Sequence, residues 1–302
     1  ANKSKLTSIG KNAFYNCAEL AEVYIPANTT VIDDYAFYNC TNLRKIYFEK
    51  ESKLINIGEK VFSYCTGLSK VEIPASVKEL KFGAFYGCSA LTDVTFEENS
   101  NLMTIDAMAF YGCSRLNYKN EAPFEIPSKV TFIGDYAFSG CTSLRSITVP
   151  YMLNHLGNYA FANCTKLNVI SIFSNLSFIG EGVFSGWASN QTIHMVGIES
   201  ALSGWSNLWH SKCNAEIIWN ADKIVTELFT YKFLDNETAY EVSLSYNVLQ
   251  DDLPPILSIP GSYGGVPVKR IADNAFAFHS YIYNVEIPNS IVTIGYKAFY
   301  LC

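Results

Sequence analysis

The chain has 302 residues, of which 49% are hydrophobic and only 17% charged, and its net charge is −6. This composition can supply a large apolar core, and without a run of lysine or arginine it argues against a nucleic-acid partner. No stretch of about 18 apolar residues is present, so the sequence predicts no membrane insertion.

A phrase of about 23 residues recurs along the chain and dominates its organisation. Each copy approximates L-x-x-V-x-I-P, a short polar turn, V-x-x-I-G, and then A-F-x-x-C. The copies are marked by their phenylalanines: Phe14, Phe37, Phe62, Phe85, Phe110, Phe138, Phe161, Phe184, Phe276 and Phe299. A repeat this short cannot bury its own apolar side, so the copies must stack as a solenoid.

Within each copy the pattern predicts short strands joined by turns. In one copy Val71 and Ile73 are two residues apart, so both point inward while Lys70 and Glu72 point outward. The proline that follows ends the strand. We expect the A-F-x-x-C segment to form a short 3₁₀ or α turn that inserts phenylalanine and cysteine into the core. The predicted fold class is therefore an α/β repeat solenoid, rich in β-structure, with a parallel sheet on one face and these turns on the other.

The repeat is lengthened once, between Phe110 and Phe138, which are 28 positions apart. Five residues are extra in this copy, and they fall within 117–123. We expect them to form a loop on the strand side that leaves the stack unbroken.

Between Phe184 and Phe276 the repeat fails, and this gap divides the chain into three parts. We predict a first repeat array at 1–197 and a tryptophan-rich cap at 198–222, because an array needs an end plate over its last open core. The third part, 223–302, is predicted to be a β-hairpin followed by the start of a second array.

The hairpin is predicted from two alternating runs, 228–233 and 239–244, on either side of a polar turn. The repeat then resumes at Ile259 and continues to Cys302. Because the chain starts and stops inside the repeat, we interpret it as part of a longer protein.

The repeated phrase resembles that of the BspA-like class of leucine-rich repeats, found on surface proteins of bacteria and some protists. The resemblance covers roughly residues 4–197 and 256–302. It implies that the chain folds as a right-handed leucine-rich-repeat superhelix. It also implies that the protein is on the cell surface or secreted. It also implies a non-catalytic role in adhesion or protein binding, with a host matrix protein, another cell-surface protein or a glycan as partner. The alternative is a structural spacer that presents another domain. One departure is His279, which stands where the pattern expects cysteine.

Seven consecutive copies carry a cysteine three residues after the phenylalanine: Cys17, Cys40, Cys65, Cys88, Cys113, Cys141 and Cys164. Equivalent Cβ atoms of stacked copies stay about 4.8 Å apart, whereas a disulfide needs about 3.8 Å. We therefore expect buried, reduced thiols that act as small hydrophobic side chains. A single file of ligands does not converge on a tetrahedral metal site, so no metal is predicted.

No constellation for catalysis is recognisable in the chain. Its four histidines lie in different copies without an acidic partner at a meaningful spacing, and no phosphate loop or dinucleotide fingerprint occurs. The sequence therefore predicts no catalytic residues and no cofactor.

Two columns of outward side chains are the candidate binding surfaces. On the sheet face the first copies combine charges with tyrosines: Glu22, Tyr24, Lys45, Tyr47, Lys70, Glu72, Asp93 and Thr95. Later copies carry mostly small, neutral residues there: Ser146, Thr148, Val169, Ser171, Thr192 and His194. On the turn side a tyrosine often follows the phenylalanine: Tyr15, Tyr38, Tyr86, Tyr111 and Tyr300. Stacked tyrosines could bind sugar rings or protein aromatics, or pack on the next copy. We favour packing on the turn side and leave both interpretations open for Tyr24 and Tyr47.

Overall fold

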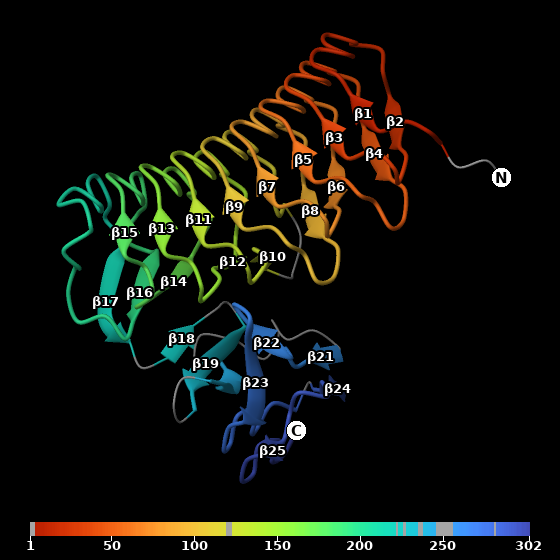
Figure 1. The fold of residues 1–302 in the computed structure, drawn as a ribbon. Coiled ribbons are helices and arrows are strands. Elements are labelled where there is room, and N and C mark those ends of the chain that lie inside the picture. The colour runs from red at the N-terminus through yellow and green to blue at the C-terminus, as the bar shows by residue number, and fades with distance from the viewer. Residues whose placement is uncertain are drawn as a thin grey trace.

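The computed structural model describes residues 4–118, 123–221, 223–225, 228–234, 238–245, 256–280 and 282–302. The chain winds as a β-solenoid through the first array and then folds back, and we call the described part of residues 223–302 the C-terminal unit (Figure 1). The predicted solenoid with parallel strands is therefore confirmed.

One side of the solenoid is an eight-stranded parallel sheet of two-residue strands, which we call the short-strand sheet. Its strands are β1 (Ser8–Ile9), β3 (Val31–Ile32), β5 (Asn56–Ile57), β7 (Glu79–Leu80), β9 (Thr104–Ile105), β11 (Phe132–Ile133), β13 (His155–Leu156) and β15 (Phe178–Ile179). The V-x-x-I-G part of each copy forms these strands. The second residue of every strand is buried because it is the one that points into the core.

A second side is built from the L-x-x-V-x-I-P part, and we call it the long-strand face. Its parallel strands form three groups in chain order, β2-β4-β6-β8, β10-β12 and β14-β16-β17. They are β2 (Glu22–Ile25), β4 (Lys45–Phe48), β6 (Lys70–Ile73), β8 (Asp93–Phe96), β10 (Phe124–Glu125), β12 (Ile147–Thr148), β14 (Val169–Phe173), β16 (Thr192–Val196) and β17 (Glu216–Ala221). The prediction of one parallel sheet was thus incomplete, since each copy contributes to two. Much of the predicted insertion loop, residues 119–122, lies outside the described residues.

The third side is formed by the A-F-x-x-C segments, which are linked turns. No α- or 3₁₀-helix occurs among the residues that the structure describes, so the expected helical turns and the α/β label are corrected. The reason is that every second amide bonds across copies, while the amides between them bond to the carbonyl three residues back in their own copy. The Phe14 amide donates to the Ala36 carbonyl at 2.7 Å, and that of Asn16 to Tyr38 at 2.8 Å. A helix would direct them along its own axis.

The core is one continuous cluster that runs the length of the first array. Its centre is a file of phenylalanine rings from Phe14 to Phe184, with neighbouring centroids 4.9 to 6.4 Å apart. Trp209 packs edge-on against Phe184, at 6.1 Å, and itself contacts Trp205 and Trp219. Beyond the file, β17 still pairs with β16, so the ladder extends into the segment predicted to be a cap. The division at 197 and 222 stays a prediction.

The C-terminal unit contains a six-stranded sheet and a two-stranded parallel sheet. Its strands are β18 (Lys223–Val225), β19 (Phe229–Phe233), β20 (Tyr240–Leu244), β21 (Ile256–Ser258), β22 (Ser262–Tyr263), β23 (Val266–Ile271), β24 (Asn284–Glu286) and β25 (Thr293–Ile294). Strands β19 and β20 pair antiparallel, as the predicted hairpin requires, and its turn residues 235–237 lie outside the described ones. The repeat resumes as parallel pairs, β21 with β24 and β23 with β25.

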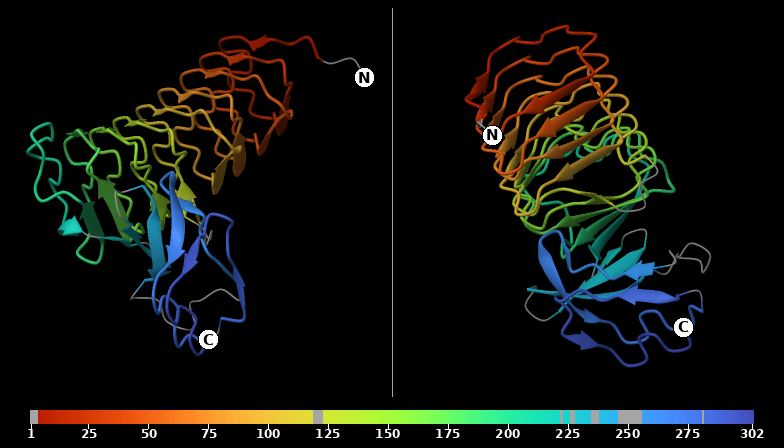
Figure 2. Two further views of the ribbon diagram at one scale, coloured as in Figure 1. Left: turned by 60° about the horizontal axis from the view of Figure 1, so that its bottom comes forward. Right: turned by 90° about the vertical axis from the view of Figure 1, so that its right-hand side faces the viewer.

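The C-terminal unit does not extend the stack of the first array. Viewed along the stack, it lies to one side, against the long-strand face of the later copies (Figure 2). Its core includes Phe173 of β14 and Val196 of β16, so the two parts share buried surface. Tyr151 joins this contact, with its ring 5.8 Å from that of Phe233. One half of the long-strand face is therefore covered by the protein's own chain.

Candidate interaction surface

The eight residues predicted on the sheet face lie on the outward side of β2, β4, β6 and β8, two from each strand. We call this the open half of the long-strand face. Strand register places them in two columns. The first column is Glu22, Lys45, Lys70 and Asp93, and the second is Tyr24, Tyr47, Glu72 and Thr95. All are exposed except Asp93, which is half-buried.

Tyr24 and Tyr47 form a stacked pair at the start of the second column. Their ring centroids are 4.5 Å apart and their planes differ by 9°. The rings remain accessible, with Tyr24 69% and Tyr47 37% exposed. The Tyr24 hydroxyl lies 3.4 Å from a Glu22 carboxylate oxygen. Local desolvation and then the Glu22 charge raise the pKa of Tyr24, so its hydroxyl stays protonated and can donate.

The first column carries both signs of charge, with two lysines in register between two acidic residues. Glu22 lies opposite Lys45, and Lys70 Nζ is 3.1 Å from Asp93 Oδ2. Exposed ion pairs of this kind add little to stability. They leave a surface with both signs of charge beside two tyrosines.

The second column continues into the covered half of the face, where its character changes. The next outward residues are Glu125, Thr148, Ser171 and His194, paired in register as Glu125–Thr148 and Ser171–His194. The last three are buried, and Ser171 is only 1% exposed. Tyr263 of β22 lies beside Ser171, and burial raises the pKa of its hydroxyl. The small, neutral residues noted in the sequence are therefore those that the C-terminal unit covers.

On the turn side the tyrosines form a ladder of their own. Tyr15 stacks on Tyr38 at 5.0 Å, and Tyr86 stacks on Tyr111 at 4.9 Å. Tyr64 bridges the two pairs edge-on, and Tyr136 and Tyr159 extend the ladder. The rings cover one another's faces, which is the packing arrangement favoured from the sequence. The last three tyrosines were missed because they stand two residues before or after the repeat phenylalanine, not next to it.

The cysteine file is also a ladder of hydrogen bonds. Each buried thiol donates from Sγ to the carbonyl of the phenylalanine in the preceding copy, at 3.0 to 3.3 Å. All nine cysteines are free. Burial raises the pKa of Cys88 and Cys164 to about 12, so these thiols stay protonated and keep their donor hydrogens.

The interpretation of these cysteines as small hydrophobic side chains missed the donor role. The sequence feature that could have indicated this donor role is Trp187, which stands in the cysteine position of the eighth copy. The Trp187 indole N–H donates to the Phe161 carbonyl at 2.9 Å. In the C-terminal unit His279 faces carbonyls of its own copy, but Cys302 Sγ again donates to Phe276, at 3.0 Å.

The sequence matches the family model described as BspA type Leucine rich repeat region, over residues 7–122, 117–239 and 265–302. The chain belongs to this family. The resemblance seen in the repeated phrase is thereby confirmed. Arrays of this family are generally non-enzymatic scaffolds, and leucine-rich-repeat solenoids generally bind proteins. Comparison with curated proteins gave no match.

Solved structures of other leucine-rich-repeat proteins are similar over nearly all of this BspA-type chain. A leucine-rich repeat protein from Bacteroides ovatus is 20% identical with a TM-score of 0.48, over 98% of this chain and 80% of that one. A leucine-rich cell surface protein from Faecalibacterium prausnitzii is 25% identical with a TM-score of 0.44, over 99% of this chain and 64% of that one. A leucine-rich repeat protein from Eubacterium ventriosum is 19% identical with a TM-score of 0.39, over 99% of this chain and 81% of that one.

In the described part of this BspA-type chain, no group of three or more histidine, cysteine, aspartate or glutamate residues is placed to hold a metal ion. The same residues contain no helix with the length and apolar character needed to cross a membrane.

Proposed function

We propose that this BspA-type array is a non-catalytic cell-surface module for adhesion, which binds a protein or a glycan through the open half of its long-strand face. The observation that carries the proposal is the Tyr24–Tyr47 stack, exposed on a rigid ladder with charged side chains in register around it. Rigid tyrosines lose little conformational entropy on binding, and they contribute large contact areas. The proposed surface location rests on the family.

Two features of the open half suit a specific partner. Its charges are of both signs and fixed in register, so a partner with complementary charges would be selected over others. Its side chains project from strands whose backbone is already paired between copies, so binding needs little rearrangement of the chain.

The test is solid-phase binding of the purified chain to a panel of host matrix proteins and glycans. We expect saturable binding that weakens about tenfold or more when Tyr24 and Tyr47 are both changed to alanine, as expected for buried aromatic anchors. The matched control is the double change of Tyr15 and Tyr38 to alanine, which removes a stacked pair from the same two copies on the turn side. Equal losses from both double variants would contradict the role of the open half.

The second candidate is a structural spacer. The unbroken phenylalanine file and the thiol ladder tie consecutive copies together and favour a stiff rod. If no member of the panel binds saturably, the spacer becomes the better account.

A further inference from the structure

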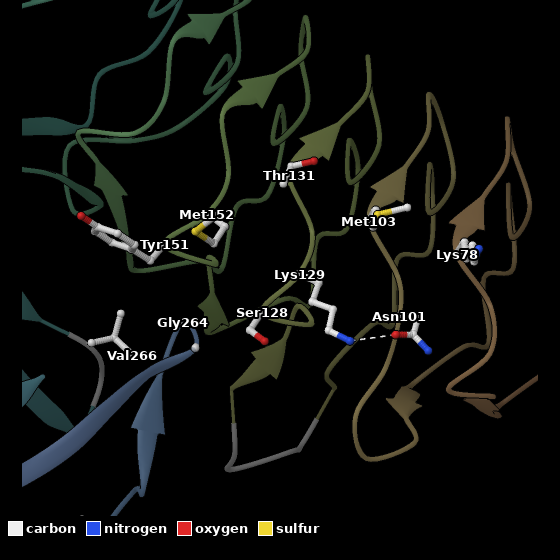
Figure 3. A pocket seen from close by; sticks show the side chains of 11 residues that line it. Lys78, Asn101, Met103, Ser128, Lys129, Thr131, Tyr151, Met152, Gly264 and Val266 are labelled. Carbon is white, nitrogen blue, oxygen red and sulfur yellow. Dashed lines mark hydrogen bonds between the residues drawn. The ribbon is translucent and has the colours of Figure 1, made fainter. Parts of the chain in front are cut away.

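A groove with a volume of about 590 Å³ lies where the first array meets the C-terminal unit (Figure 3). Its long wall is made by the turns that join the two strand types in successive copies. Lys78, Met103 and Met152 come from three of these turns. The groove is therefore separate from the outward columns of the open half.

The other wall is the tight turn at Gly264 and Gly265, between β22 and β23. The Tyr151 amide donates to the Gly264 carbonyl at 3.1 Å, which ties this turn to the first array. Gly265 has a φ of 86°, and a Cβ there would lie 2.5 Å from Ser128 Cβ. Only glycine can approach this closely, so the turn is built to close the groove against the array.

The charge of the groove is positive, although the whole chain is acidic. Lys78 and Lys129 line it, and no aspartate or glutamate does. Among the described residues neither lysine belongs to an ion pair. Lys129 Nζ is held by Asn101 Oδ1 at 2.7 Å, the contact dashed in Figure 3. Two cations that have no counter-charge among the described residues of a concave site attract an anionic ligand.

Backbone groups of the described turns along the long wall are already paired between copies. The Met103 amide donates to the Lys78 carbonyl at 2.9 Å, and the Thr131 amide donates to Met103 at 3.0 Å. These groups are not available for β-strand addition, which leaves the side chains of this wall as its means of recognition.

The lining side chains match a ligand that is rich in hydroxyl groups and also acidic. Ser128, Thr131 and Asn101 offer hydroxyl and amide groups, while Met103 and Met152, 48% and 56% exposed, offer apolar surface. Lys78 and Lys129 are two copies apart, which corresponds to about 10 Å along the stack. We infer that the groove binds an acidic oligosaccharide, whose carboxylate or sulfate groups contact Lys78 and Lys129.

The test is isothermal titration calorimetry of the full chain with heparin hexasaccharide, hyaluronan hexasaccharide and neutral maltohexaose. We expect at least one acidic sugar to bind and the neutral one not to bind. Each of the changes Lys78→Gln and Lys129→Gln should weaken binding roughly tenfold, because each removes a charge-assisted contact. The matched control is Lys53→Gln. Lys53 Nζ contacts Asn28 Oδ1 at 3.1 Å, which is the same lysine–asparagine pairing in an earlier copy, outside the groove. The Lys53→Gln change should therefore leave binding unchanged.

Three results would overturn the inference. The first is the absence of binding by both acidic sugars. The second is an equal loss from Lys53→Gln, which would indicate a general charge effect. The third is equally tight binding of hexaglutamate, lost with the same lysines, which would indicate an acidic peptide. The double alanine variant of Tyr24 and Tyr47 should keep groove binding. If this double variant lost sugar binding, the sugar would be bound by the open half. That result would favour the proposed function and contradict this inference.

Discussion

In β2, β4, β6 and β8 the outward side chains of the long-strand face are mostly tyrosines and charged residues, whereas in β12, β14 and β16 they are mostly serine, threonine and histidine. The core beneath the two halves is the same, with one phenylalanine file and one thiol ladder. The halves differ in what covers them, since solvent faces the first and the C-terminal unit packs on the second. The types of the outward residues thus depend on what packs against each copy, whereas the types of the inward residues depend only on stacking between copies.

The largest expected effect comes from placing a charge in the covered half. Ser171→Arg should destabilise the protein by about 3 kcal/mol or more, because the guanidinium would be buried without a counter-charge beneath Tyr263. Thr95→Arg, at the corresponding position of the open half, should change stability by less than about 0.5 kcal/mol. Urea unfolding followed by tryptophan fluorescence measures both. Similar losses from the two variants would mean that the halves do not differ in burial.

An intermediate and equal effect is expected in the shared core. Cys88 lies beneath the open half and Cys164 beneath the covered half, and the test is to change each to alanine. Each should cost about 1 to 2 kcal/mol, because a buried phenylalanine carbonyl loses its thiol donor. The same urea titration applies, and the serine variants, which keep a donor, should recover part of the loss. A much larger cost for Cys164→Ala would show that the C-terminal unit also reinforces the core.

The smallest effect is expected at the boundary between the halves. Partial desolvation raises the pKa of Glu125, on β10, above its ordinary value of 4.5, although the side chain still reaches solvent. A carboxyl with a raised folded pKa binds its proton more tightly when folded, so its ionised form weakens the fold at neutral pH. Glu125→Gln should therefore be the more stable protein at pH 7. Its advantage should shrink as pH falls through the raised pKa and vanish below about 4.5. Thermal unfolding of both proteins from pH 7 to pH 4 measures this, and a constant difference would contradict it.

The inward half of each repeat could be predicted from the sequence in detail. The apolar residues two apart in each strand, and the phenylalanine and cysteine after the second strand, are buried as the periodicity requires, except in the terminal copies, where Phe14, Cys17 and Cys302 are exposed because no further copy covers them. The family followed from the same positions. The turn conformation was wrong because a single copy does not reveal that its amides bond to the next copy. The donor role of the cysteines was missed for the same reason, although Trp187 in their file carries the same chemistry.

For the candidate surface, the sequence placed the eight outward residues on one face, and the strand register agrees with that placement. It could not show that the open half ends near Glu125, because the covering strands, β18 onward, come from a later part of the chain outside the first array. The groove was missed for a related reason, since Lys78 and Gly264 are brought together only by this contact.

By itself, the sequence determined the period, the stack and the inward face of each copy, because each depends on contacts between equivalent positions of neighbouring repeats. Only the tertiary structure decided which outward residues meet solvent. That choice depends on where the C-terminal unit docks, through contacts such as Tyr151 with Phe233, and no local pattern encodes a packing partner so distant in the chain.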